Sequence, residues 1–214
     1  RTVWEAQQLT LGAEKFGVAT QMGNQGYSNE GARQCCEIVW SGDLGNVTEV
    51  HAWSDRPLWA QGLTEIPKPE PVPEYLDWDC WLGPAAFRPY KKDIYHTFQW
   101  RGWYEFGTGA LGDMACHLMD AAFWNLELGS PTSVELKEIE SASKVAFPKS
   151  AVVEYQFPAR GSLPPVKLTW YEGGKKPAKP AQMEENRQLA KGGQLIIGSK
   201  ATVYDGNDYC NSPR

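Results

Sequence analysis

The stretch that decides the fold is residues 107–120, which read GTGALGDMACHLMD. Three glycines come first, and a helical pattern of small and apolar residues follows them. Asp113, His117 and Asp120 are spaced by four and three residues, which places them within about 60° of one another around a helix. A carboxylate beside an imidazole fixes the tautomer of the histidine and raises its basicity, so this face suits proton transfer from a hydroxyl group. A structural helix whose histidine satisfies a local hydrogen bond is the alternative.

The glycines of this stretch match the pattern G-x-G-x-x-G at Gly107, Gly109 and Gly112. In dinucleotide-binding folds that pattern follows a buried strand and opens a helix that receives a pyrophosphate. We do not assign that role here, because Asp113 follows the third glycine directly and its charge would repel phosphates. A metal site built from the carboxylates and His117 is a further alternative, but no second histidine lies in a related context, so we predict no metal.

Upstream of this stretch, apolar residues recur at three- and four-residue steps over residues 3–16, which predicts an amphipathic helix that ends at Gly17. An extended run at 18–22 and a turn follow. A second helix, capped by Ser28 or Asn29, is expected to reach Trp40, with an inner face of Ala32, Cys35, Cys36, Val39 and Trp40. Helix, strand, turn and helix in this order are typical of the end of an α/β unit.

Residues 46–53 then read as a strand, and the chain changes character at Pro57. The segment 57–90 is rich in proline and tryptophan, and proline disfavours helix interiors and central strands, so we expect a long ordered loop. Tryptophan contributes 10 of the 214 residues. Two explanations stay open, a rigid aromatic surface for a flat ligand such as a sugar ring, or a heavy aromatic core.

Downstream, from residue 131, apolar residues alternate with polar ones, as in Val153, Tyr155 and Phe157. This period of two is typical of antiparallel strands with one buried face. The sequence therefore predicts an α+β (α/β) fold, a large open and mainly antiparallel sheet with helices on one face. The later strands are expected at residues 134–139, 151–157, 166–171, 194–197 and 201–204, with a hairpin turn at 198–200.

Composition excludes several classes of protein. The net charge is −5 and no stripe of Lys and Arg appears, so we expect no nucleic-acid partner. No run of 18 apolar residues predicts a membrane span. The five cysteines form no C-x-x-C pair, which argues against a zinc site and a disulfide framework and favours free thiols, most of them buried.

Several motifs together point to a family. The stretch 113–120 has the form Asp-x-Ala-x-His-x-x-Asp, and segments 18–26 (VATQMGNQG), 56–62 (RPLWAQG), 77–84 (DWDCWLGP) and 100–103 (WRGW) accompany it. These segments resemble the glucose–fructose oxidoreductase/inositol dehydrogenase (Gfo/Idh/MocA) family, in particular its tryptophan-rich bacterial branch. The family motif has Gly where this chain has Ala115, and the resemblance extends over nearly the whole chain.

The resemblance implies a division into two domains. Residues 1–25 would be the tail end, a last helix and strand, of an N-terminal Rossmann NAD(P)-binding domain. Residues 26–214 would be the C-terminal substrate-binding and oligomerisation domain, and the chain would be truncated at both ends. The family's Glu-Lys-Pro motif would precede the first helix, so Glu14-Lys15-Phe16 does not correspond to it.

The resemblance also implies roles for individual residues. His117 would be the catalytic acid/base and Asp113 would orient it or bind substrate. Asp120, Trp59 and Trp103 would bind substrate, and Asn24 and Arg101 would lie near the nicotinamide end of NAD or NADP. Most contacts to that cofactor would come from the absent N-terminal domain.

The implied activity is an NAD(P)-dependent oxidoreductase acting on a hydroxyl of a sugar, glycoside or cyclitol, with this chain alone inactive. The alternatives are a non-catalytic carbohydrate-binding or oligomerisation module of the same fold, NAD-dependent glycoside hydrolysis through a keto-sugar, and a metal-dependent hydrolase. We expect a homo-oligomer, a dimer or tetramer. The compartment stays open between the cytoplasm and the periplasm of a bacterium.

Overall fold

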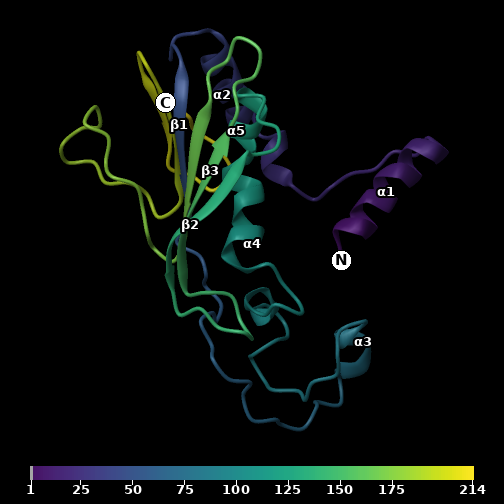
Figure 1. Ribbon diagram of the computed structural model, residues 1–214. Coiled ribbons are helices and arrows are strands. Elements are labelled where there is room, and N and C mark those ends of the chain that lie inside the picture. The colour runs from purple at the N-terminus through teal and green to yellow at the C-terminus, as the bar shows by residue number, and fades with distance from the viewer. Residues whose placement is uncertain (1) are drawn as a thin grey trace.

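The centre of the molecule is one open sheet, which the computed structural model shows within the described residues 2–214 (Figure 1). The six strands lie in the order β2-β3-β4-β1-β5-β6. Neighbours are antiparallel except β1 and β4, which run parallel with Val50 opposite Leu168. The predicted open, mainly antiparallel sheet is confirmed. The strands are β1 Val47–Trp53, β2 Ser133–Glu140, β3 Ser150–Phe157, β4 Val166–Tyr171, β5 Gly193–Gly198 and β6 Thr202–Asp205.

Every segment expected as a strand from residue 46 onward forms one. In β3 the alternation predicts the buried face, since Val153, Tyr155 and Phe157 pack in or against the core under the helices. The hairpin turn between β5 and β6 is also present, since the amide of Gly198 donates to the carbonyl of Ala201 at 2.9 Å. Residues 18–22, expected as an extended run, lie in an exposed segment that pairs with no strand within residues 2–214.

Helices cover one face of the sheet (Figure 1). Between the two layers, Leu168 and Trp170 of the sheet pack in one core with Cys35 and Leu118 of the helices, all at most 1% exposed. The expected inner face of the second helix is wrong at its end, because Trp40 is 57% exposed. The helices of this layer are α2 Glu30–Trp40, α4 Gly109–Leu118 and α5 Asp120–Asn125.

The helical pattern that follows the glycines of residues 107–120 forms two helices in the structure. Met119 is both the C-cap of α4 and the residue before α5, and its amide donates to the carbonyl of Ala115 at 2.9 Å. The turn at this residue lets both helices bury their small apolar side, with Leu118 and Ala122 at most 1% exposed. Asp120 therefore begins a second helix and does not continue the face of the first.

A lobe formed by residues 57–107 extends below the sheet and contains α3 (Trp78–Leu82) and the 3₁₀ helix η2 (Gln99–Gly102) (Figure 1). The lobe has its own aromatic core. Arg88, 7% exposed, lies over the rings of Tyr95, Trp103 and Phe106 at 5.2–5.4 Å and pairs with Glu105. The predicted ordered loop is therefore held by buried aromatic rings. That core comprises Trp78, Leu82, Tyr90, Tyr95 and Trp103.

The other face of the sheet is open. It is polar around β1 and β4, whereas Trp53, Leu195 and Tyr204 form a small buried apolar cluster toward β5 and β6. His51 lies 3.2 Å from Glu49 and 3.0 Å from the hydroxyl of Tyr171, and Lys167 pairs with Glu49 at 2.8 Å. The edge strand β2 is exposed along its whole length, including the apolar Val134, at 57%. Around β1 and β4, polar side chains therefore replace a second helical layer on this face.

The first helix, α1 (Val3–Phe16), lies apart from the sheet (Figure 1). It ends at Gly17 as predicted, but none of its residues is buried, so its apolar face contacts no other element. A chain segment with the short 3₁₀ helix η1 (Gln25–Ser28) joins it to α2. Within residues 2–214, no helix is long and apolar enough to cross a bilayer.

Candidate active site

A cleft of about 290 Å³ lies where the segment before η1 passes α4 and η2. It joins parts of the chain that are almost one hundred residues apart in sequence. Four of the residues predicted from the motifs lie in it, namely Asn24, Arg101, Asp113 and His117. The remaining lining residues are Met22, Gly23, Trp100, Thr108, Gly112 and Cys116.

Asn24 fastens the crossing segment to α4. Its side-chain Nδ2 donates to the carbonyl oxygen of Cys116 at 2.7 Å. Its Oδ1 is buried and has no hydrogen-bond partner among residues 2–214. Burying an acceptor without a partner costs free energy. A ligand that donates a hydrogen bond to this oxygen would offset that cost.

Arg101 and Asp113 form an ion pair across the cleft, with Nε of Arg101 2.9 Å from Oδ1 of Asp113. Both side chains are about one-quarter exposed. The guanidinium also lies over the rings of Phe98 and Trp100 at 4.4 and 4.5 Å, which fixes its plane. The carboxylate of Asp113 thus orients Arg101, whereas the family resemblance implied that it would orient His117 or bind substrate.

His117 is half-buried on α4, and its Nδ1 is buried without a hydrogen-bond partner among the described residues. The edge of its ring meets the ring of Tyr209 at a centroid distance of 5.0 Å. Burial raises the pKa of Asp120, and the nearby His117 opposes that rise. His117 therefore has a carboxylate in its electrostatic surroundings, although Asp120 belongs to the next helix.

Two residues near the cleft were not predicted from the sequence to belong to the site. Tyr209 is 92 positions from His117, so no local pattern connects them. Cys116 lies between Asp113 and His117 in the motif, and the sequence predicted no role for it beyond that of a free thiol. The Cys116 side chain is exposed, but partial desolvation and the neighbouring charge of Asp113 raise the pKa of its thiol, which keeps it protonated at neutral pH.

The two tryptophans predicted to bind substrate differ in position. Trp59 is 4% exposed, but the guanidinium of Arg101 lies 5.7 Å from its ring, so it supports the cleft from behind. Trp103 has no exposed surface, and its indole N–H donates to the carbonyl of Ile94 at 2.9 Å. A ring with no free face cannot stack on a sugar, so the prediction for Trp103 is corrected in favour of a core residue.

The glycines at 107, 109 and 112 have packing reasons of their own. Gly109 has φ +66°, and a Cβ there would lie 2.7 Å from the ring of Phe147. A Cβ on Gly107 would meet the backbone of Arg101 at 2.5 Å. The segment before them contains η2 and no strand, whereas a dinucleotide fingerprint follows a buried strand.

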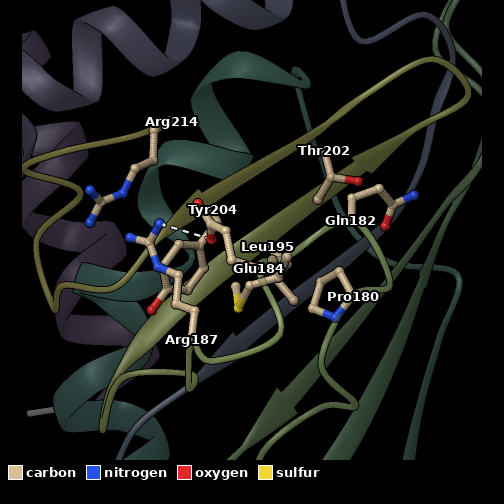
Figure 2. Close-up of a pocket in the computed structure, with 9 residues that line it drawn as sticks. Pro180, Gln182, Glu184, Arg187, Leu195, Thr202, Tyr204 and Arg214 are labelled. Carbon is tan, nitrogen blue, oxygen red and sulfur yellow. Dashed lines mark hydrogen bonds and ion pairs between the residues drawn. The ribbon is translucent and has the colours of Figure 1, made fainter.

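Another hollow of about 290 Å³ lies on the open face over β5 and β6 (Figure 2). Leu195 and Tyr204 from these strands line it together with the loop that carries Glu184 and Arg187. Arg187 pairs with Glu184 at 3.4 Å and lies 5.4 Å from the ring of Tyr204. None of the residues predicted from the motifs lines this hollow. Within residues 2–214, no three His, Cys, Asp or Glu side chains come together as metal ligands.

Comparisons with known proteins agree with this architecture. The WlbA dehydrogenase from Bordetella pertussis, solved in complex with NADH and UDP-GlcNAcA, superposes with a TM-score of 0.55 at 16% identity, over 97% of this chain and 49% of that one. The super-repressor mutant of Gal80p from Saccharomyces cerevisiae superposes with a TM-score of 0.53 at 13% identity, over 93% and 44% of the two chains. At these identities the likeness shows the fold alone.

The chain spans about half the length of these solved structures. No curated protein sequence matches it. The family model for the C-terminal α/β domain of the Gfo/Idh/MocA oxidoreductase family matches residues 37–157. This match includes α4 with Asp113 and His117, and it covers more than half of the 214 residues. The chain therefore belongs to the Gfo/Idh/MocA oxidoreductase family.

Proposed function

We propose that this chain is the substrate-binding and catalytic portion of an NAD(P)-dependent oxidoreductase that acts on a hydroxyl group of a sugar, glycoside or cyclitol. The observation that carries the proposal is the meeting of Asn24, Arg101, Asp113 and His117 in one cleft. In the intact protein, residues 1–25 would be the tail end of a Rossmann domain and residues 26–214 the substrate domain. The exposed apolar face of α1 supports that division, because it offers a surface for further chain to cover.

His117 would act as the acid/base. Its buried Nδ1 has no partner among the described residues, so it can accept the proton of a substrate hydroxyl. The imidazolium formed in this way would be stabilised by the nearby carboxylate of Asp120. Asp113 is held by Arg101 through Oδ1, which leaves its second oxygen to accept a hydrogen bond from a neighbouring substrate hydroxyl.

The cleft fits the nicotinamide end of the cofactor. The buried Oδ1 of Asn24 is an acceptor without a partner, and the carboxamide of nicotinamide carries the matching N–H donor. Bound nicotinamide would supply the acceptor for the hydride that leaves the substrate carbon. NAD and NADP differ at the adenosine end, and this proposal places only the nicotinamide end in the cleft, so it applies equally to both cofactors.

The edge strand β2 would serve assembly. The exposed strand β2 carries apolar side chains at Val134, Leu136 and Ile139, with 47–57% of each exposed. An exposed edge strand with apolar residues is unfavourable in an isolated protein, and a second copy would cover it. We therefore propose a homodimer, or a tetramer built from dimers, for the intact protein.

The test of the catalytic proposal is NAD(P)H formation at 340 nm by the intact protein with a panel of sugars, glycosides and cyclitols. We expect His117→Asn to lower kcat at least about 100-fold while cofactor binding is unchanged, since a positioned acid/base contributes about that much. The matched control is His51→Asn, which changes a histidine on the open face of the sheet.

The outcomes separate the alternatives. Full turnover by His117→Asn would contradict its role as acid/base. If the intact protein binds sugar but reduces no cofactor with any of the panel, the non-catalytic carbohydrate-binding module is the better description. Release of a free sugar from a glycoside only in the presence of NAD would indicate hydrolysis through a keto-sugar.

A further inference from the structure

A third hollow, of about 310 Å³, lies beside the cleft, between α3 and η2. Trp100 lines both the cleft and this hollow, so the two are adjacent and share one wall. The volume is at the lower end of the range for ligand pockets, which suits a single ring. The lining residues are Trp81, Leu82, Gly83, Pro84, Trp100 and Phe106.

The aromatic walls of this hollow are held rigidly. Trp81 stacks on Trp78 with ring centroids 4.7 Å apart and an angle of 8°, so one of its faces is covered by the lobe core. Phe106 packs against Trp81 at 5.0 Å. Trp100 is held from the other side by the guanidinium of Arg101 at 4.5 Å. Aromatic rings that are already immobilised lose little entropy when a ligand stacks on them.

The indole N–H groups distinguish these tryptophans from those of the core. Trp59, Trp78 and Trp103 donate to Gln61, Arg88 and Ile94, at 2.6, 2.8 and 2.9 Å. Those of Trp81 and Trp100 donate to no protein acceptor within residues 2–214. Both side chains are half-buried and both indole nitrogens remain accessible to solvent, so a ligand oxygen can replace water at these two donors.

We propose that this hollow binds a second pyranose ring, joined by a glycosidic bond to the ring whose hydroxyl lies in the cleft. The aromatic walls can stack on the C–H faces of a pyranose, and the two indole N–H groups can donate hydrogen bonds to its oxygens. None of the described residues that line the hollow is charged, which favours a neutral sugar over the diphosphate of a sugar nucleotide. The inference rests on the proposed function and narrows its substrate class to glycosides of at least two rings.

The test is ¹⁹F NMR of the chain labelled with 5-fluorotryptophan, with the Trp81 and Trp100 resonances assigned by substitution with Phe. The probes are cellobiose, maltose, chitobiose and their methyl monosaccharides. We expect a disaccharide to shift both resonances and to bind about tenfold more tightly than its monosaccharide, which shifts only Trp100. Trp81→Phe should abolish that gain, and Trp4→Phe on the exposed α1 should leave it unchanged.

A second variant protects the test against misfolding. Pro84 is exposed at the mouth of the hollow, so Pro84→Trp fills it from the surface and should also remove the gain for disaccharides. A shift of Trp100 with no shift of Trp81 for any disaccharide would overturn the second-ring site and leave the proposed function intact. No response of either resonance to the whole panel would overturn the site as well, and the cofactor-reduction assay then decides the proposed function independently.

Discussion

Two helices of this molecule form for opposite reasons. α1 has a complete local set of end signals, a capping box between Thr2 and Glu5 and a left-handed Gly17 at its end, yet it buries nothing. α4 has no side-chain cap at Thr108 and begins with a glycine, yet it buries Met114 and Leu118 in the core. Local signals are enough to start a helix, whereas burial of an apolar face fixes its position.

α4 receives its N-terminal partner from elsewhere in the chain. Glu172, just after β4 and 3% exposed, accepts a hydrogen bond from the indole of Trp170 at 3.0 Å and lies beside the amide of Leu111 in the first turn of α4. The first-turn amides of a helix have no partner within the helix, and a carboxylate is favoured there. The helix that carries Asp113 and His117 is therefore placed by the sheet.

The largest expected difference between the helices concerns their leucines. Leu118→Ala in α4 should lower the free energy of unfolding by about 3 kcal/mol, because it opens a cavity in the core where Leu118 is 1% exposed. Leu9→Ala in α1, where the leucine is 75% exposed, should change it by less than about 0.5 kcal/mol. Urea denaturation measures both, and equal effects would show that α1 is packed against the domain in solution.

The cap from Glu172 predicts a dependence of stability on pH. Burial raises the pKa of Glu172 from its ordinary 4.5 to about 7. The folded protein therefore holds this proton more tightly than the unfolded chain, and the resulting stability is present below pH 4.5 and lost as the pH rises to about 7. Glu172→Gln keeps an acceptor without the charge.

Relative to wild type, the Glu172→Gln variant should gain stability across this pH range, up to about 3 kcal/mol. Urea denaturation at intervals from pH 4.5 to 8 measures the gap, which is the difference in free energy of unfolding between the variant and wild type. A gap that stays constant with pH, or that closes as the pH rises, would contradict a buried carboxylate at the start of α4.

The smallest expected effects come from two glycines of similar backbone conformation. Gly17 and Gly109 have φ of +62° and +66°, but a Cβ meets nothing at Gly17 and the ring of Phe147 at 2.7 Å at Gly109. Gly109→Ala should therefore lower the free energy of unfolding by about 2 kcal/mol. Gly17→Ala should only fray α1, by about 1 kcal/mol locally.

Circular dichroism and amide hydrogen exchange separate these two effects. For Gly17→Ala, faster exchange should be confined to α1 with an unchanged global midpoint of unfolding. A shift of that midpoint as large as the one for Gly109→Ala would mean that the end of α1 is part of the cooperative core.

Much of the fold was predictable because periodicity is local. The alternation of residues 153–157 and the helical spacing around His117 report the buried face without knowledge of what covers it. The site was predictable only in its parts. Spacing placed Asp113 beside His117, but Arg101 competes for the same carboxylate, and that pairing depends on how η2 folds back onto α4.

By itself, the amino-acid sequence determined the strands, the first helix with its caps, and the motif that places Asp113 and His117 one turn apart. Only the tertiary structure decided that Met119 separates Asp120 from α4, that Trp103 is core while Trp100 lines the cleft, and that Tyr209 meets His117. The physical reason is the distance along the chain over which each interaction acts. Hydrophobic periodicity and capping act within a few residues, whereas burial and ion pairing depend on contacts between segments that the sequence leaves far apart.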